Sequence, residues 1–323
     1  MCKARASPCA IFLSGQKLGK LRISIVEFLN TAPLVWGFTD GPLIGKYDLS
    51  FAVPSQCAEA LKRGDVDVAI IPSIEYQRID NTVVLPGMSV SGDGEIRSLL
   101  VVSKRPIERA KRIALDTSSR ATVAYVKILA RDFWRIAPEF VDAAPNPTEM
   151  LQNADAALII GDPALRIAIE MDALSSGASG KSGDGCCGCD GAPDLPIPGF
   201  ETLYIYDVAQ QWQEMTAKPS VMAIWVGRKD VITPEVVADF QASKEYGLQH
   251  VRDIAEGASV KLDLPVPELE RYLTENVRFD LTAPYLAGLN LYFQKAAELG
   301  LVPRNKPIEF AAARAMSTAR QEL

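Results

Sequence analysis

Residues 26–34 read VEFLNTAPL, and this stretch decides how the chain begins to fold. The apolar run Leu21–Val26 that leads into it has the length and composition of a buried β-strand. Asn30 and Thr31 follow, and Pro33 favours an extended residue before it and the first turn of a helix after it. Asn30 should therefore lie at the carboxyl end of a strand. Ligands bind at this edge in α/β proteins, so Asn30 and Thr31 are candidate ligand contacts.

Strand-like and helix-like patterns alternate outward from this junction. Alternation of this kind predicts parallel-rich sheets with helices on both faces, an α/β fold, and two such series predict two lobes. The expected strands are Leu21–Val26, Tyr47–Val53, Val66–Ile71, Thr82–Leu85, Arg97–Ser103, Arg112–Asp116, Phe140–Asp142, Ala156–Ile160, Thr202–Tyr206 and Val221–Val226. The expected helices are Pro54–Arg63, Ser119–Trp134, one after Pro163, and three segments from Pro234 onward with breaks near Pro265–Pro267 and at Pro284.

The strands at Leu99–Ser103 and Val221–Val226 are candidate crossovers between the lobes, so that both ends of the chain build the first lobe. The basic start of the sequence is expected to be a loosely attached extension. The expected division is residues 1–19 for the N-terminal extension, 20–100 and 225–323 for lobe I, and 101–224 for lobe II.

A Gly/Ser/Pro-rich segment, residues 175–199, cannot bury a core and is expected to be a flexible surface insertion. It holds three of the six cysteines, Cys186, Cys187 and Cys189. Their spacing differs from the Cys-x₂-Cys of zinc sites and no histidine is nearby, so we favour adventitious thiols over a metal site. The cysteines form no disulfide ladder, which fits a reducing compartment.

The totals exclude several classes of protein. A net charge of −6 and a pI near 5.1 argue against nucleic acid as the main partner. No apolar run approaches the ~20 residues that span a bilayer, and the apolar stretch near the start is shorter than a signal peptide requires. We therefore expect a cytoplasmic protein with no membrane partner. The sequence leaves the oligomeric state open, a homodimer included.

The absence of several known motifs excludes further kinds of chemistry. The sequence has no Walker loop, no dinucleotide fingerprint, no G-x-S-x-G and no H-E-x-x-H, so no cofactor and no metal is implied. The single histidine, His250, lies in a charged helical stretch, and we favour a solvated helix-face histidine over a catalytic one.

The stretch LDTSSRATV places Thr117, Ser118 and Ser119 between the end of a strand and the start of a helix. Three hydroxyls beside the free N–H groups of a helix start suit a carboxylate or phosphate. The simpler alternative is an ordinary N-cap, which needs only one hydroxyl.

Other polar side chains stand at strand ends. Arg97 and Ser98 precede an apolar strand; Arg97 is either a bidentate carboxylate partner or a surface charge, and Ser98 is a substrate contact or a satisfied core group. Ser73 follows a buried strand. Gly161 and Asp162 follow another, where glycine permits close approach of a ligand and Asp162 is a candidate helix cap.

Five stretches occur in an order typical of one family: FLNTAPL, GDVDVAIIPSIEY, IRSLLVVSK, LDTSSRATV and AALIIGDPAL. Together they resemble the chorismate dehydratases of the futalosine route to menaquinone, and DVAQQWQEMTAKPSVMAIWVGR resembles that family's return to the first lobe. The resemblance implies a two-lobed fold like that of type II periplasmic binding proteins, with the active site in the cleft between lobes. The extension and the insertion depart from the family pattern without touching the cleft motifs.

The implied reaction removes water from chorismate, a dicarboxylate, to give 3-(1-carboxyvinyloxy)benzoate. Loss of the C3 proton and the C4 hydroxyl makes the ring aromatic, so the enzyme need supply mainly orientation. The resemblance implies that the substrate's enolpyruvyl carboxylate is the base, that Asn30 orients the reacting groups and that Ser98 hydrogen-bonds the substrate.

Three rivals remain at this point. A solute-binding protein of the same fold would need export. The related 1,4-dihydroxy-6-naphthoate synthase relies on a histidine base, and here only His250 could serve. A sensory anion-binding module would need an output domain, which the sequence lacks.

Overall fold

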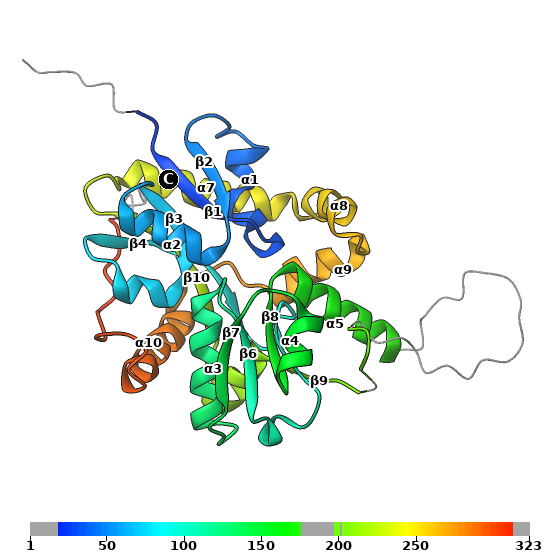
Figure 1. The fold of residues 1–323 in the computed structure, drawn as a ribbon. Helices are drawn as coiled ribbons and strands as arrows, with labels where there is room; N and C mark the ends of the chain where they lie inside the picture. Colours follow the sequence, from blue (N-terminus) through cyan, green and yellow to red (C-terminus); the bar gives the residue numbers. More distant parts are fainter. Residues whose placement is uncertain (1–18, 176–196, 201, 313–323) are drawn as a thin grey trace, which may run out of the picture.

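Two five-stranded sheets form the framework of the computed structural model, which describes residues 19–175, 197–200 and 202–312. Figure 1 shows one sheet in the upper half of the molecule and the other in the lower half. The first sheet, in the order β2-β1-β3-β10-β4, contains β1 (Arg22–Val26), β2 (Asp48–Ala52), β3 (Val68–Pro72), β4 (Thr82–Gly92) and β10 (Ser220–Arg228). The second, in the order β7-β6-β8-β5-β9, contains β5 (Leu99–Ser103), β6 (Arg112–Asp116), β7 (Glu139–Ala143), β8 (Ala156–Ile160) and β9 (Tyr204–Asp207).

The helices connect the strands and cover the sheets, which confirms the α/β prediction. They are α1 (Ala32–Thr39), α2 (Pro54–Arg63), α3 (Arg120–Asp132), α4 (Pro147–Asn153), α5 (Asp162–Ser175), α6 (Val208–Thr216), α7 (Pro234–Gln249), α8 (Val251–Leu262), α9 (Val266–Arg271) and α10 (Ala283–Glu298). Short turns lie at η1 (Leu29–Thr31), η2 (Ser73–Arg78), η3 (Ile107–Arg109) and η4 (Tyr272–Asn276), and η4 is a π-helical turn. Proline stands in the first turn of α1, α2, α4, α7, α9 and α10, where its fixed φ favours the helix.

Each sheet is mixed rather than parallel-rich. β1 pairs in parallel with β2 and β3, and β6 pairs in parallel with β7 and β8. β10 and β5 are each inserted antiparallel between two strands of their sheets. Each of these two strands comes directly after a segment in which the chain passes from one sheet to the other. Entering from the other sheet, each strand runs opposite to the neighbours with which it pairs.

The two passages precede these strands. β5 and β10 each lie wholly within one sheet, so neither strand crosses between the halves as expected. The chain changes sheet within residues 93–98 and 208–219, somewhat before the expected boundaries at 101 and 225.

β4 is also longer than the expected strand Thr82–Leu85. Its register with β10 shifts between Val84 and Ser89, and this irregularity accommodates Pro86 and Gly87, whose φ is +77°. A proline that ends a strand in a sequence pattern is tolerated here because the bulge releases its missing N–H from the ladder.

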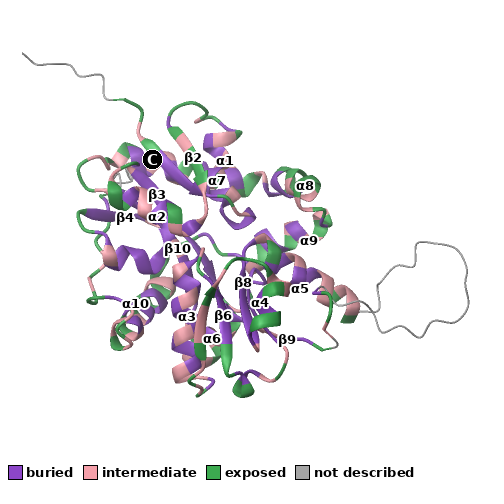
Figure 2. Cartoon of the chain, viewed as in Figure 1, coloured by how far each residue is buried: buried purple, intermediate pink, exposed green. Residues whose placement is uncertain are grey.

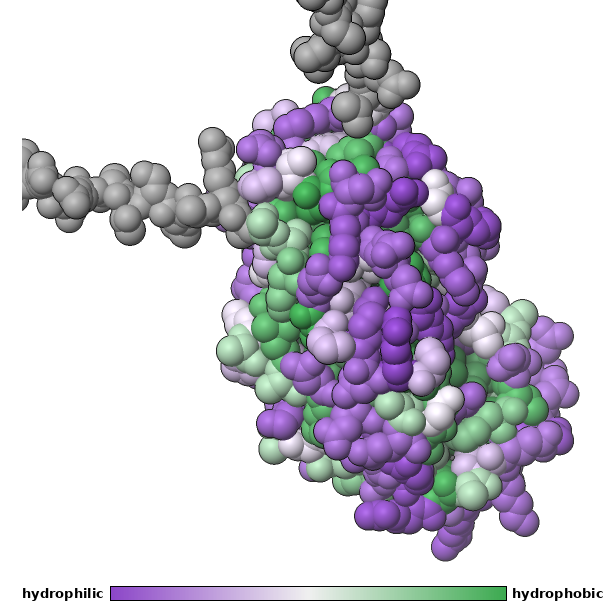
Figure 3. Space-filling model, turned by 90° about the vertical axis from the view of Figure 1, so that its left-hand side faces the viewer, coloured by the Kyte–Doolittle hydropathy of each residue, from purple (hydrophilic) through white to green (hydrophobic). Residues whose placement is uncertain are grey.

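The core joins both halves. One cluster of buried apolar residues includes side chains from both sheets, and a second, smaller cluster lies around β8. Figure 2 shows the central strands of the sheets buried and the outward faces of the helices exposed, whereas the edge strands β2 and β7 are partly exposed. Hydrophilic residues cover most of the face in Figure 3, with hydrophobic residues in smaller groups between them. Within the described residues, no helix is long and apolar enough to cross a membrane.

Candidate active site

A small cavity lies between the two sheets, where their parallel strands end. The first sheet and its connections line it with Val26, Phe28, Asn30, Thr31, Pro54, Pro72, Val90, Met222 and Ala223, and the second with Leu99, Ser119, Thr122, Ile160 and Gly161. The centre of a water molecule can move over only about 30 Å³ within it. Small-molecule sites usually offer roughly 300–1,000 Å³. The conformation described is therefore closed.

The turn after β1 positions Asn30 at this cavity. Asn30 is 8% exposed and lies in η1, directly beyond the carboxyl end of β1. The hydroxyl of Thr31 donates to the carbonyls of Val26 and Phe28, so its proton stabilises the turn and its lone pairs remain to face a ligand. Thr31 thus fixes the backbone that presents the Asn30 amide.

The loop after β8 meets this turn from the other sheet. Gly161 has φ +70°, and a Cβ added to it would lie 2.7 Å from the Phe28 ring. Asp162 accepts a hydrogen bond from the Leu29 N–H at 3.1 Å, and burial raises the pKa of its carboxyl. The two loops are therefore in direct contact, and they close one side of the cavity.

Ser98 lies beside the cavity wall at the start of β5. It is 1% exposed, and its carbonyl accepts the Gly161 N–H at 2.8 Å. Its hydroxyl accepts a hydrogen bond of 2.8 Å from the Tyr272 hydroxyl. The Tyr272 hydroxyl also lies close enough to the Asn30 side chain to interact with it, so these three polar residues form one group.

The three hydroxyls of the α3 start do not converge. Ser119 lines the cavity, where its Oγ lies 3.0 Å from the hydroxyl oxygen of Thr122. Thr117 and Ser118 line a separate open hollow beside Asp142. Ser119 makes no side-chain cap hydrogen bond, so the first N–H groups of α3 keep their capacity to bind an anion.

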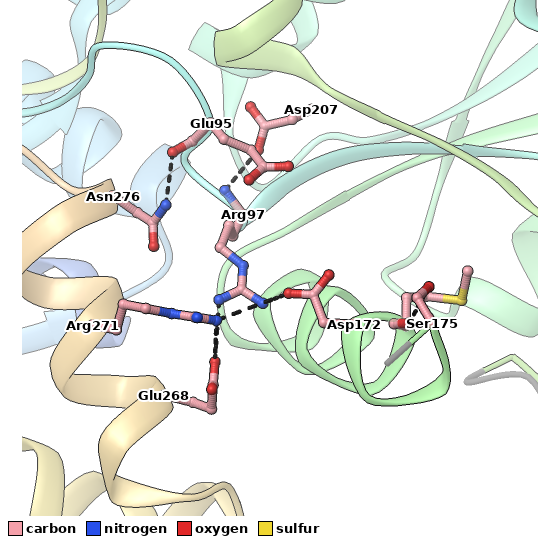
Figure 4. A network of polar contacts seen from close by, with 9 residues as sticks. Glu95, Arg97, Asp172, Ser175, Asp207, Glu268, Arg271 and Asn276 are labelled. Carbon is pink, nitrogen blue, oxygen red and sulfur yellow. Dashed lines mark hydrogen bonds and ion pairs between the residues drawn. The ribbon is translucent and has the colours of Figure 1, made fainter. Parts of the chain in front are cut away.

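The Arg97 guanidinium is directed away from the cavity. It forms ion pairs with Asp172 of α5 and with Glu268 of α9, the latter at 3.3 Å, as Figure 4 shows. Its backbone has a left-handed φ of +64°, and its N–H donates to the buried Asp207 carboxylate at 2.6 Å. The described contacts of Arg97 thus join the passage at 93–98 to α5, α9 and α6.

Asp207 anchors both passages between the sheets. Its two oxygens accept N–H groups of Ile96 and Arg97 on one side, and of Ala209 and Gln210 on the other. Burial raises the pKa of the Asp207 carboxyl to about 7.

The remaining sequence candidates lie elsewhere. Ser73 is fully buried and donates to the Val221 carbonyl at 2.7 Å, while Pro72 takes its place on the cavity wall. His250 lies between α7 and α8, with Nδ1 2.7 Å from the Tyr246 carbonyl oxygen and its ring stacked on Tyr246. Cys186, Cys187 and Cys189 lie outside the described residues.

Neutral groups therefore dominate the cavity. Of the described residues that line it, none has a titratable side chain. The described residues also contain no group of three or more His, Cys, Asp or Glu arranged to hold a metal ion. Such a cavity can bind an anion through amide, hydroxyl and helix N–H donors. Among the residues that the structure describes, none that lines the cavity could act as a base toward a bound ligand.

Comparison with known proteins agrees with this geometry. A family model described as menaquinone biosynthesis matches residues 21–179 and 191–298, which is more than half of the chain. The chain belongs to this menaquinone-biosynthesis family. A relative of the chain, the chorismate dehydratase of Thermus thermophilus, is 26% identical over 255 residues, covering 77% of this chain and 86% of the relative.

Solved structures share the fold at low identity. A protein from Archaeoglobus fulgidus superposes with a TM-score of 0.65 and 18% identity, over 89% of this chain and 100% of that one. The periplasmic aliphatic sulphonate binding protein of Escherichia coli gives a TM-score of 0.53 and 14% identity, over 91% and 94%. The periplasmic-binding-protein-like fold expected from the sequence is therefore confirmed for this family member.

Three residues at the site of this family member escaped the sequence analysis. Tyr272 is 174 positions from Ser98 in the chain, and no local pattern links them. Phe28 stood within the quoted motif, where an aromatic residue beside a strand end was a usable signal. Thr122 follows Ser119 by one helical turn, and this spacing places both hydroxyls on the same face of α3.

Proposed function

We propose that the chain is a chorismate dehydratase of menaquinone biosynthesis, a hydro-lyase acting by the futalosine route. One observation carries the proposal beyond family membership. The cavity between the sheets presents Asn30, Ser119 and Thr122 to a ligand, and the described residues that line it include no titratable side chain. This lining suits a dicarboxylate substrate in which one of the substrate's own carboxylates acts as the base.

The reaction divides between substrate and protein. The C3 proton of chorismate moves to the enolpyruvyl carboxylate of the same molecule, this carboxylic acid returns the proton to the departing C4 hydroxyl, which leaves as water, and the ring becomes aromatic. In the proposal, the free N–H groups at the start of α3 bind one substrate carboxylate. Asn30 orients the reacting groups and Ser98 hydrogen-bonds the substrate, so the protein contributes chiefly orientation.

Binding requires the cavity to open. Space of about 30 Å³ is far below what a substrate with a six-membered ring needs. We infer that the halves separate by movement at the passages 93–98 and 208–219, and that this movement breaks the Phe28–Gly161 and Leu29–Asp162 contacts and admits chorismate.

The related naphthoate synthase reading receives no support from the site. A histidine base would have to reach the ligand, whereas the ring of His250 is held by Tyr246 between α7 and α8. His250 is also absent from the described lining of the cavity. A cytoplasmic location stays a prediction from the sequence, and the oligomeric state, a homodimer included, stays open.

Turnover by the purified protein tests the proposal. The protein is mixed with chorismate alone, and products are separated by chromatography and weighed by mass spectrometry. We expect a product lighter than chorismate by one water, at a rate proportional to protein concentration. Binding of chorismate without conversion would favour a receptor of the same fold, and absence of both would refute the proposal.

A further inference from the structure

Tyr272 occupies an unusual position in the C-terminal helical region. It is the first residue of the π-helical turn η4, which follows α9 directly. π-Helical turns are rare and occur frequently at functional sites, because they redirect a side chain out of the regular helical register. Here the redirected side chain is a tyrosine that is only 1% exposed.

The Tyr272 hydroxyl connects the two residues expected to act on the substrate. It donates to Ser98 Oγ at 2.8 Å, and it lies close enough to the Asn30 side chain for the two polar groups to interact. Asn30 follows β1 of the first sheet, whereas Ser98 precedes β5 of the second. The hydroxyl thus bridges the two walls of the site.

The segment after η4 fixes Tyr272 to the first sheet. Arg278 exchanges two backbone hydrogen bonds with Ser91 of β4, at 2.8 and 2.9 Å. Ser98 directly precedes β5 of the second sheet, so the Tyr272–Ser98 bond joins a segment held to the first sheet to the start of β5. In the closed arrangement this bond fixes the orientation of the Ser98 hydroxyl.

The direction of the bond also matters. Burial raises the pKa of the Tyr272 hydroxyl well above its ordinary value, so the group stays protonated and acts as a donor. Because Tyr272 donates to Ser98, the Ser98 proton must point elsewhere. A hydroxyl that accepts one hydrogen bond becomes a stronger donor in the next, so a substrate that reaches Ser98 in the opened site would meet a strengthened donor.

We propose that Tyr272 is a positioning residue of the dehydration reaction, which holds Ser98 and Asn30 in their reactive orientation when the two halves close. The proposal rests on the proposed function and extends it to a residue that does not line the cavity. A purely structural tyrosine would stabilise the fold without affecting the orientation of Ser98 and Asn30 toward the substrate.

Tyr272→Phe tests the role with little change in packing. We expect kcat to fall by about 10- to 100-fold with a much smaller change in KM, because the lost hydroxyl misorients groups used in the transition state. Tyr76→Phe is the matched control. Tyr76 is also 1% exposed, its hydroxyl donates to the Pro307 carbonyl and accepts from the Glu309 N–H, and it does not line the cavity. This control should retain the wild-type kcat.

A double-variant cycle separates positioning from general damage. If Tyr272 acts through Ser98, Tyr272→Phe should cost little further activity in a Ser98→Ala background, since the two share one effect. Independent, multiplying losses in the double variant would overturn the proposal, as would a kcat for Tyr272→Phe equal to that of wild type.

If wild-type protein fails to convert chorismate, the proposed function is refuted, but the role of Tyr272 can still be tested by a crystal structure of Tyr272→Phe. Positioning requires that the Ser98 hydroxyl or the Asn30 amide changes orientation once the Tyr272 hydroxyl is gone. Unchanged orientations of both side chains would overturn the role of Tyr272, whatever the wild-type activity.

Discussion

Gly161 offers the sharpest test of how the two halves meet. Its φ of +70° lies in the left-handed region, and a Cβ there would stand 2.7–2.9 Å from three atoms of the Phe28 ring. Gly161→Ala therefore carries two costs. The left-handed backbone costs an L-residue roughly 1–2 kcal/mol. Forcing the ring aside adds about 1–3 kcal/mol, as overpacking does elsewhere.

Gly45→Ala is the matched control. Gly45 has φ +73°, and a Cβ added to it would meet no atom within 4 Å. This variant should therefore lose only the backbone contribution, about 1–2 kcal/mol in the free energy of unfolding. Gly161→Ala should lose roughly 2–5 kcal/mol in total. Chemical denaturation at a fixed pH measures both differences against wild type.

Activity and a second variant complete the test. Displacement of Phe28 moves the turn that carries Asn30, so kcat/KM of Gly161→Ala should fall about tenfold or more, whereas Gly45→Ala should match wild type. In a Phe28→Ala background the ring that causes the clash is absent. Relative to Phe28→Ala alone, the further change Gly161→Ala should therefore cost only the backbone contribution. Equal losses of stability in Gly161→Ala and Gly45→Ala would refute the proposed contact between the two loops.

Three further predictions follow from the site. Asn30→Ala and Ser98→Ala should each lose turnover, by about 100-fold, while circular dichroism and the unfolding midpoint show a folded protein; full activity in both variants would place the site elsewhere. Burial raises the pKa of Asp207 from 3.8 to about 7, so the native protein retains a proton that the unfolded chain releases. Stability should therefore fall as the pH rises from about 4 to 7 and level off above that, and Asp207→Asn should remove this part of the pH dependence; an unchanged slope in the variant would contradict the assignment. Chelators should leave turnover unchanged, and a chelator-sensitive rate would direct attention to the cysteines of segment 175–199.

The fold was accessible from the sequence because its signals are local. An apolar strand, a short polar pair and Pro33 place Asn30 at a strand end, and the structure has Asn30 there, in η1. Alternating patterns gave the α/β class. The antiparallel insertion of β5 and β10 was inaccessible, because strand direction within a sheet depends on partners distant in the chain.

The sequence could not predict the direction in which the side chains at the site point. Thr117, Ser118 and Ser119 are consecutive, but the turn before α3 sends only Ser119 into the cavity. The sequence left Arg97 open between a carboxylate partner and a surface charge; the side chain is buried, and its partners are Asp172 and Glu268 of the protein itself. A left-handed residue at this position has no reliable sequence signature, so the direction of Arg97 required the structure.

Proton nuclear magnetic resonance of chorismate mixed with wild-type protein, and with Asn30→Ala in parallel, tests the central claim most directly. The ring protons of the cyclohexadiene should be replaced by aromatic signals in the wild-type sample, with the vinyl protons retained. In the Asn30→Ala sample the cyclohexadiene signals should persist over the same period. Absence of aromatic signals with wild-type protein, or their equal appearance with the variant, would contradict dehydration at the cavity between the two sheets.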